Sequence, residues 1–361
     1  MKNYRLLALL LIMVLCLGAV ACSSREAAGA VVNAVGGQLL RVHFIDVGQA
    51  DAILIEGPKG ENIVIDAGNN NDGEKVVNYI RNQDISELKA VIGTHPHEDH
   101  IGGLDAVIKS FDIDKVYLPK AVHTTESFRD VLRAVSDRGI KVATAAKGVS
   151  LPLVGMTAEF VGPVSSKYDN LNDHSAVLKL TYGETGFLFQ GDAEEESEKD
   201  ILENDAGSKL RADVLKLGHH GSSSSTTPEY LEEVKPEYAV ITAGKGNDYG
   251  HPHKETMELL KDKGIVVYRT DEQGTIIAES DGENIKFNVD PGSFEYGPEN
   301  STALKLYTDS AGNGVIKGNI NSKGEKIYHL PGGAYYDRTV PEKWFKTEQE
   351  ARAGGFKPSS K

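Results

Sequence analysis

The chain has few cysteines and no excess of basic residues. Of its 361 residues only two are cysteines, Cys16 and Cys22, and both fall within the first 22 positions. The rest of the chain therefore has no thiolate to offer, so any metal there must be bound by histidine and carboxylate. The formal net charge is -14, which disfavours tight non-specific binding to nucleic acid.

The charge is unevenly distributed along the chain. Residues 301–361 hold ten Lys/Arg against six Asp/Glu, whereas the residues before them hold 29 basic and 47 acidic side chains. We find no internal repeat and no low-complexity tract. The sequence therefore indicates an acidic globular body followed by a mildly basic tail.

The amino terminus is typical of an export signal. "MKNYR" is a positive segment, and the apolar run that follows is shorter than a membrane-spanning helix needs. "GAVAC" resembles a bacterial lipobox, in which Cys22 becomes the lipidated first residue of the mature chain. We therefore predict a signal peptide over 1–22 and a lipid anchor at the outer face of the cytoplasmic membrane, with plain secretion as the alternative.

Strand and helix patterns alternate between residues 39 and 289. Two groups of strands with interspersed helices predict an α/β (layered α+β) fold, in which two sheets are sandwiched between helical layers, αββα. The predicted strands include 40–47, 52–57, 62–68, 88–95, 176–183, 186–192, 212–220, 238–244 and 265–270, with a closing hairpin over 274–289. The predicted helices cover 72–84, 99–111, 125–139, 194–205, 228–234 and 253–264. A linker is predicted over 290–302 and a small basic module over 303–361.

The stretch "GTHPHEDHIGG", Gly93 to Gly103, follows an apolar strand and concentrates metal-binding side chains. His95 and His97 share a face of an extended segment, while Asp99 and His100 can turn towards a second point. Zn²⁺ suits such a set, with Mn²⁺ as an alternative. Further ligands must come from other strand ends, where α/β active sites lie. The candidates are His174, Asp192, His219 and His220.

"THPHEDHIGG", "IDAG", "FQGD" and "GHHGS" occur in an order that resembles the metallo-β-lactamase superfamily. The longer runs "FIDVGQADAILIE", "NDHSAVLKLTYG", "LKLGHHGSSSST" and "YGHP" are similar to the hydrolase domain of ComEC-type competence (DNA-uptake) proteins. The resemblance covers about residues 39–289. Ala50 departs from it, because the family has Gly there, and the sequence has no multi-helix membrane channel.

The resemblance implies a ligand set for two zinc ions. His95 and His97 would bind the first ion, Asp99 and His100 the second, and Asp192 would bridge both. His219 is the expected ligand of "GHHGS", although the pair leaves open whether His220 binds metal instead of supporting the site or contacting substrate. His174 is either a further ligand or a polar strand-edge residue.

Other residues are expected to support the centre. Asp66 of "IDAG" would hold the histidine loop, residues 95–100, in place. Asp46, like Asp51, is expected to bond turn amides beside the site. His251 of "YGHP" would contact a phosphate or donate a proton, unless it is a loop histidine. Asp99, Asp192 and His251 are thus the catalytic candidates.

The resemblance implies hydrolysis of phosphodiesters by two metals, with DNA as the expected substrate. The alternatives are a phosphorylcholine-esterase-like or lactamase-like hydrolase of small molecules, and a non-catalytic protein that binds DNA or cell-wall polymer. The tail resembles a small module of secreted bacterial nucleases. Its aromatic and basic residues either form a surface for nucleic acid or wall polymer or form the module's own core; they are Tyr335, Tyr336, Arg338, Lys343, Trp344 and Phe345.

Overall fold

The computed structural model describes residues 39–121, 123–204, 208–297, 307, 313–321, 323–333 and 335–359. The predicted signal peptide and Cys22 lie outside the described residues. Among the helices within them, none is long and apolar enough to cross a membrane.

The first sheet begins with the three strands expected after residue 39. β1 (Leu40–Phe44), β2 (Ala52–Glu56) and β3 (Ile63–Ala67) are antiparallel neighbours. Beyond β3 the strands are parallel, and beyond β1 lies the predicted closing hairpin. The order is β17-β16-β1-β2-β3-β5-β7-β8, with β5 (Ala90–Ile92), β7 (Val116–Leu118), β8 (Val142–Thr144), β16 (Ile276–Ser280) and β17 (Ile285–Phe287).

Helices cover the outer face of this sheet. They are α2 (Gly73–Arg81), α3 (Glu98–Ile101), α4 (Leu104–Ser110) and α5 (Glu126–Arg138), and a two-stranded pair, β4 (Glu87–Leu88) and β6 (Asp112–Ile113), lies among them in the chain. The start of α5 was expected, and Thr125 caps it by accepting a hydrogen bond from the Phe128 amide. Gly139 ends it in a left-handed conformation at φ 62°.

The single helix predicted over 99–111 is wrong, because it is divided into α3 and α4. Two glycines separate them where the chain passes very close to the turn after β3. A Cβ on Gly103 would lie 2.3 Å from the Ala67 carbonyl oxygen, and one on Gly102 would lie 2.4 Å from the Asn70 nitrogen. The glycines thus let the histidine loop pack directly on the neighbouring backbone.

The second sheet combines antiparallel and parallel strands. β10 (Thr157–Gly162), β11 (Val177–Tyr182) and β12 (Thr185–Phe189) are antiparallel, whereas β12 to β15 are parallel. The order is β15-β14-β13-β12-β11-β10-β9, with β9 (Ser150–Leu151), β13 (Val214–Lys216), β14 (Tyr238–Ile241) and β15 (Val266–Arg269). Its helices are α6 (Glu195–Asn204), α7 (Pro228–Val234), α8 (Lys254–Asp262) and α9 (Thr270–Gln273).

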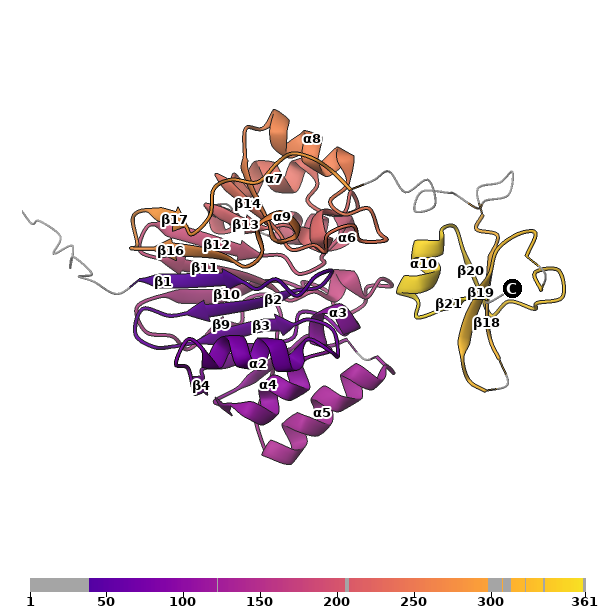
Figure 1. The fold of residues 1–361 in the computed structure, drawn as a ribbon, viewed down its shortest axis with the longest axis horizontal. Helices are drawn as coiled ribbons and strands as arrows, with labels where there is room; N and C mark the ends of the chain where they lie inside the picture. Colours follow the sequence, from indigo (N-terminus) through magenta and orange to yellow (C-terminus); the bar gives the residue numbers. More distant parts are fainter. Residues whose placement is uncertain are drawn as a thin grey trace, which may run out of the picture. The chain divides into compact units, whose positions relative to one another are not determined.

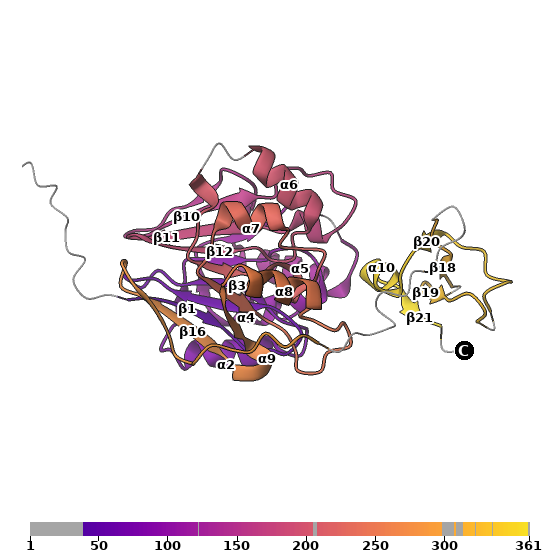
Figure 2. The ribbon, with the colours of Figure 1, turned by 90° about the horizontal axis from the view of Figure 1, so that it is seen from above.

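Three apolar cores hold four layers together, which confirms the predicted αββα fold. One core lies between the sheets and contains Phe44, Phe160 and Phe189. A second packs the first sheet against α2, α4 and α5, and a third packs the second sheet against α6, α7 and α8. In Figure 1, α2, α4 and α5 lie below the strands and α7 and α8 above them. Figure 2 shows α6 and α7 beside β10, β11 and β12.

A separate small sheet occupies the carboxyl end, ordered β20-β18-β19-β21. Its elements are β18 (Ile316–Ile320), β19 (Lys326–His329), β20 (Lys343–Phe345), α10 (Glu348–Ala353) and β21 (Lys357–Pro358). Ile316, Tyr328, Phe345 and Phe356 form its own core. The first part of the predicted linker is bonded to the αββα body, because the Gly292 amide donates to the Val267 carbonyl and the Gly297 amide to the Pro252 carbonyl.

Candidate metal centre

Five segments converge at one edge of the two sheets. They lie at or after the carboxyl ends of strands in the parallel part of each sheet, where α/β sites form. Asp66 lies near the end of β3, while β5 leads into His95, β12 into Asp192, β13 into His219 and His220, and β14 into the segment that carries His251.

The Asp192 carboxylate lies at the middle of this convergence. The residue is 1% exposed. Its Oδ2 lies 3.2 Å from His100 Nε2, 3.7 Å from His219 Nε2, 3.8 Å from His95 Nε2 and 3.9 Å from His220 Nε2. One oxygen therefore faces four imidazole nitrogens that come from both sheets.

Two groups of ligand atoms share this carboxylate. Asp99, His100, Asp192 and His220 each offer an atom within 4.8 Å of the others. On the other side, His95 Nε2 and His97 Nδ1 lie 2.9 Å apart. Asp192 Oδ2 is close to both sets, since it lies 3.8 Å from His95 Nε2 and 3.2 Å from His100 Nε2.

Buried polar atoms without partners fit these residues to divalent cations. His100 Nε2, His220 Nε2 and Asp192 Oδ1 are buried without a hydrogen-bond partner among the described residues. Leaving such atoms unsatisfied costs about 1–3 kcal/mol each, and native proteins seldom do so without a reason. Imidazole and carboxylate are the ligands that Zn²⁺ accepts where thiolates are lacking.

Hydrogen bonds behind the rings fix which nitrogen faces the centre. His100 Nδ1 lies 2.8 Å from Asp66, His219 Nδ1 lies 2.8 Å from Glu194, and His220 Nδ1 lies 2.8 Å from the Thr242 carbonyl. Because these oxygens accept, each Nδ1 donates, so that in the neutral ring each Nε2 lone pair points at the centre.

Asp66 contacts Thr94, which directly precedes the histidine loop, and His100 within the loop. Asp66 is fully buried and left-handed at φ 57°. Besides facing His100, it accepts hydrogen bonds from the Thr94 amide at 2.8 Å and from the Thr94 hydroxyl at 2.6 Å. The carboxylate therefore ties the ring of His100 to the strand end that carries His95.

Both histidines of "GHHGS" reach the centre, although successive residues of a strand face opposite sides. The backbone explains this, because His219 and His220 are both left-handed, with φ of 47° and 54°. Such conformations are costly for residues other than glycine and tend to be kept at functional sites. The sequence left open whether His219 or His220 binds metal, and the geometry allows both rings to do so.

The structure does not bring His174 into the cluster. Its Nε2 lies 3.0 Å from the Tyr168 carbonyl oxygen, and no cluster of potential metal ligands among the described residues includes it. The next residue faces the centre instead, since Ser175 Oγ lies 3.4 Å from His95 Nδ1 and accepts from the Asp192 amide. Asp46 lies in a turn, where it accepts from the Gly48 amide.

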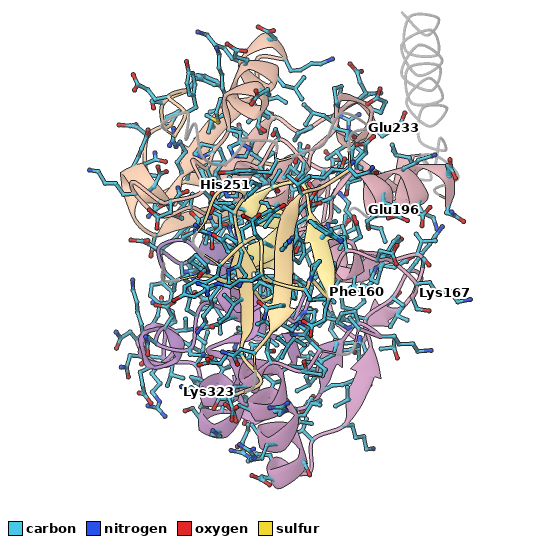
Figure 3. The ribbon with its side chains drawn as sticks, turned by 90° about the vertical axis from the view of Figure 1, so that its right-hand side faces the viewer. Phe160, Lys167, Glu196, Glu233, His251 and Lys323 are labelled. Atoms are coloured by element: carbon cyan, nitrogen blue, oxygen red, sulfur yellow. The ribbon has the colours of Figure 1, made fainter. Side chains whose placement is uncertain are left out.

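His251, labelled in Figure 3, is 2% exposed, and its ring centre lies 5.3 Å from that of His219 and 6.1 Å from that of His220. Its Nδ1 lies 3.1 Å from Gln49 Nε2, and its own Nε2 has no hydrogen-bond partner among the described residues. The ring is therefore placed beside the "GHHGS" ligands with one nitrogen available.

Sequence reasoning missed three charged residues behind the ligands. Glu194 accepts from Asn172 and Ser224 while it faces His219. Asp51, expected to bond only turn amides, lies 3.3 Å from His220 Nδ1 and 2.7 Å from Lys216 Nζ. The available signal was Lys216 itself, because a lysine within the apolar run "VLKLG" must be paired if it is buried.

Burial and neighbouring charges shift the pKa values of the histidines at the centre. Burial lowers the pKa of the His95 and His97 imidazoles. Burial alone would also lower the pKa of His220, but the carboxylates of Asp192 and Asp51 raise it to about 10. The pKa of His100 is likewise raised well above its usual value, because Asp192 and Asp99 outweigh its burial.

Metal binding is therefore expected to release protons. At pH 7 the metal-free His220 carries a proton that a metal must displace, so apparent affinity should rise about tenfold per pH unit for each proton lost. The same raised pKa stabilises the metal-free fold below about pH 6.5, and that stability is lost as the pH rises through about 10. Competition with a chromophoric chelator at several pH values measures the slope, and an affinity independent of pH would contradict it.

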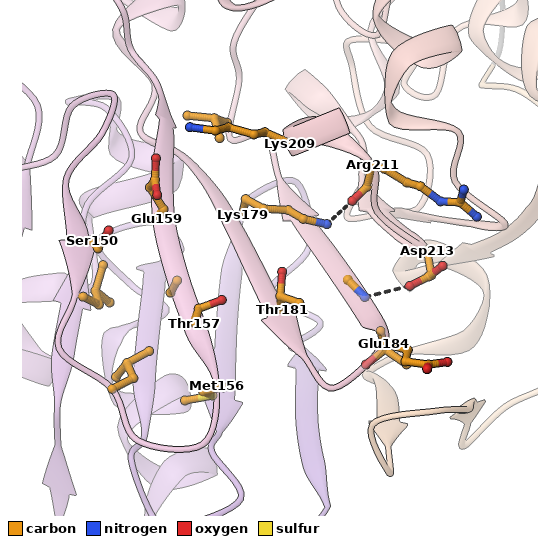
Figure 4. Close-up of a pocket in the computed structure, with 16 residues that line it drawn as sticks. Ser150, Met156, Thr157, Glu159, Lys179, Thr181, Glu184, Lys209, Arg211 and Asp213 are labelled. Carbon is orange, nitrogen blue, oxygen red and sulfur yellow. Dashed lines mark hydrogen bonds between the residues drawn. The ribbon is translucent and has the colours of Figure 1, made fainter. Parts of the chain in front are cut away.

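Away from the metal centre, a cavity of about 880 Å³ opens on the outer face of β10 and β11 and is shown in Figure 4. Its lining includes no histidine, and the basic side chains of Lys179, Lys209 and Arg211 are matched by three carboxylates. Lys179 donates to the Arg211 carbonyl, and burial lowers the pKa of its amine to about 8. With no excess positive charge, this cavity does not favour a phosphate.

The fold and the histidine–carboxylate centre at its strand ends define a metal-dependent hydrolase. Residues 45–245 match the family model of the metallo-beta-lactamase superfamily, and the chain belongs to that superfamily. Residues 295–358 match the family model named ArfC.

Among curated proteins, the chain is 31% identical to "ComE operon protein 3" of Bacillus subtilis over 252 residues, which are 65% of this chain and 32% of that protein. It is 29% identical to "Recombination protein 2" of Haemophilus influenzae over 225 residues, which are 61% of this chain and 26% of that protein. It thus spans about a third or less of these relatives' length. The solved metallo-beta-lactamase fold protein YhfI from Bacillus subtilis is similar with a TM-score of 0.45 and 14% identity, covering 67% of this chain and 100% of that one. The predicted superfamily and its competence-protein relatives are confirmed.

Proposed function

We propose that the chain is an exported phosphodiesterase that uses two divalent metal ions and acts on DNA. The observation that carries the proposal is the Asp192 Oδ2 atom, which lies 3.2 to 3.9 Å from four imidazole Nε2 atoms. A carboxylate in that position can be shared by two ions. Hydrolases with paired metals use such a bridge for in-line displacement at phosphorus.

The proposed ligands follow from the two groups. His95, His97 and His219 would hold one ion, Asp99, His100 and His220 would hold the other, and Asp192 would serve both. The ions, Zn²⁺ or Mn²⁺, would supply Lewis acidity that lowers the pKa of water to about 7 and offsets charge on phosphate oxygens. Asp66, Glu194 and the Thr242 carbonyl would keep the rings oriented for that purpose.

His251 is proposed as a hydrogen-bond donor to the substrate. The Gly244 amide donates to Gln49 Oε1 at 3.0 Å, which turns the Gln49 amide nitrogen towards His251 Nδ1. That Nδ1 then accepts, so the proton of the neutral ring resides on Nε2, the nitrogen without a partner. Burial keeps the pKa of this ring well below its usual value, which suits donation to a phosphate or leaving oxygen without charge.

The names of the relatives support DNA as the substrate. They include "ComE operon protein 3", "Recombination protein 2" and "Competence protein ComA" of Neisseria gonorrhoeae. The predicted signal and the lipobox at Cys22 would place the hydrolase outside the cytoplasmic membrane. An enzyme in that location meets DNA before or during uptake.

The proposal is tested by assays with and without metal. We expect the purified chain to cleave single- or double-stranded DNA and bis-p-nitrophenyl phosphate, to lose both activities after chelation, and to recover them with Zn²⁺ or Mn²⁺. Cleavage of the small diester alone would redirect the substrate to wall or lipid phosphodiesters. Cleavage of neither by a chain with two bound metals would contradict the proposal in favour of a binding protein or a hydrolase of other bonds.

A further inference from the structure

The aromatic residues of the carboxyl-terminal sheet divide between its core and its surface. Phe345 is 3% exposed and packs with Phe356, whereas Trp344 is 50% exposed and Tyr335 is 39% exposed. Alternation along β20 explains the contrast, because successive residues of a strand face opposite sides. The module's core is complete without Trp344 and Tyr335, so their exposure needs another explanation.

Cationic side chains accompany the exposed rings. Lys317 lies opposite Trp344 in the β18–β20 register, with its Nζ 5.7 Å from the Trp344 ring centre and 4.5 Å from that of Tyr336. The Arg338 guanidinium lies 4.5 Å from the Tyr335 ring centre. Positive charge is therefore held at the faces of aromatic rings.

Three carboxylates of the module are hydrogen-bonded within it. Glu342 accepts from the Ile320 amide, Glu350 accepts from the Lys346 amide, and Glu348 accepts from the Tyr328 hydroxyl. Lys343 and Lys346 are exposed on either side of Trp344 and Phe345. A hollow of about 520 Å³, lined by residues 313–315 with Trp344 and Lys346, adjoins the exposed indole.

We propose that Trp344, Tyr335, Lys317, Arg338 and Lys346 form an aromatic–cationic surface that binds a single-stranded polynucleotide. Bases stack on exposed rings in a way that tolerates any sequence, while nearby cations contact the phosphates. The local excess of ten basic over six acidic residues in 301–361 is complementary to a polyanion, in contrast to the acidic body. This inference rests on the proposed phosphodiesterase function, because the surface would hold the polymer that the metal centre cleaves.

The single tryptophan of the chain makes the test direct, because all tryptophan fluorescence reports on Trp344. The full chain carrying Asp192→Ala is titrated with oligothymidylate, which this variant does not consume. We expect saturable quenching that weakens about tenfold between about 50 and 200 mM salt, as displacement of roughly three counterions predicts. Tyr335→Ala should weaken binding by about tenfold, because it removes one stacking ring and leaves the reporter.

Matched lysine variants separate this surface from general positive charge. Lys346→Ala should weaken binding and reduce the salt dependence, because Lys346 lines the hollow beside Trp344, whereas Lys323→Ala, in the β18–β19 turn labelled in Figure 3, should leave both nearly unchanged. Equal effects of the two substitutions, or no quenching at all, would overturn the proposal, and so would tighter binding of a neutral chitin oligomer. If the wild type cleaves DNA but Trp344 fluorescence is not quenched, only the proposed binding surface is contradicted. If fluorescence is quenched but the metal-loaded wild type does not cleave DNA, only the proposed phosphodiesterase function is contradicted.

Discussion

Replacing Asp192 with alanine is expected to abolish phosphodiester hydrolysis while the chain remains folded. Its Oδ2 faces the Nε2 atoms of four histidines, so its loss removes a ligand from both proposed ions at once. Removing residues behind metal ligands in such sites already costs about 10- to 100-fold, and a shared ligand should cost more. Initial rates on bis-p-nitrophenyl phosphate, with bound metal counted by elemental analysis, measure the effect.

Asp130→Asn is the control, because this aspartate is on α5 and pairs with Arg133 in solvent. It removes the same charge and should leave both rate and metal content unchanged. If Asp192→Ala retained two metals and more than about a tenth of the wild-type rate, the carboxylate would not bridge the ions, and the proposed ligand sets would have to be redrawn.

Replacing Lys216 with methionine is expected to destabilise the fold by about 3–5 kcal/mol, the cost of removing one partner of a buried ion pair. Lys216 and Asp51 are each 1% exposed, and Lys216 Nζ lies 2.7 Å from Asp51 Oδ2. The pair joins β13 of one sheet to the β1–β2 turn of the other. Lys216, with His220 and His100, holds the pKa of Asp51 below its usual value against its burial, so methionine removes the largest of the positive charges that compensate this buried carboxylate.

Urea unfolding of the metal-free chain near neutral pH measures this cost. The loss should shrink as the pH falls towards the pKa of an ordinary carboxyl, because protonated Asp51 needs no cation. The double variant Asp51→Asn/Lys216→Met should be more stable than Lys216→Met alone, since it buries no charge. Lys141→Met, at an exposed position, should stay within about 0.5 kcal/mol. A Lys216→Met chain as stable as the wild type would show that Asp51 does not depend on its buried cation.

The "HPHEDH" segment could be identified from the sequence because its side chains are neighbours in the chain. Whatever the rest of the fold does, His95, His97, Asp99 and His100 stay within the short segment from the end of β5 to α3. The strands could also be predicted from the sequence, since alternation and apolar runs reflect the two buried sheet faces. The division of the predicted helix 99–111 could not be predicted, because the close approach of Gly102 and Gly103 to residues 67–70 depends on packing between distant segments.

The sequence by itself thus determined the superfamily, the layered fold and the composition of the histidine loop, because these follow from local patterns and ordered motifs. Tertiary structure alone decided that His220 joins His100 and Asp192 in one group, and that Ser175 rather than His174 faces the centre. It also decided that Asp51 meets Lys216 and that Trp344 is exposed while Phe345 is buried. These outcomes depend on left-handed backbone turns and on register between strands far apart in the chain, which no local pattern encodes.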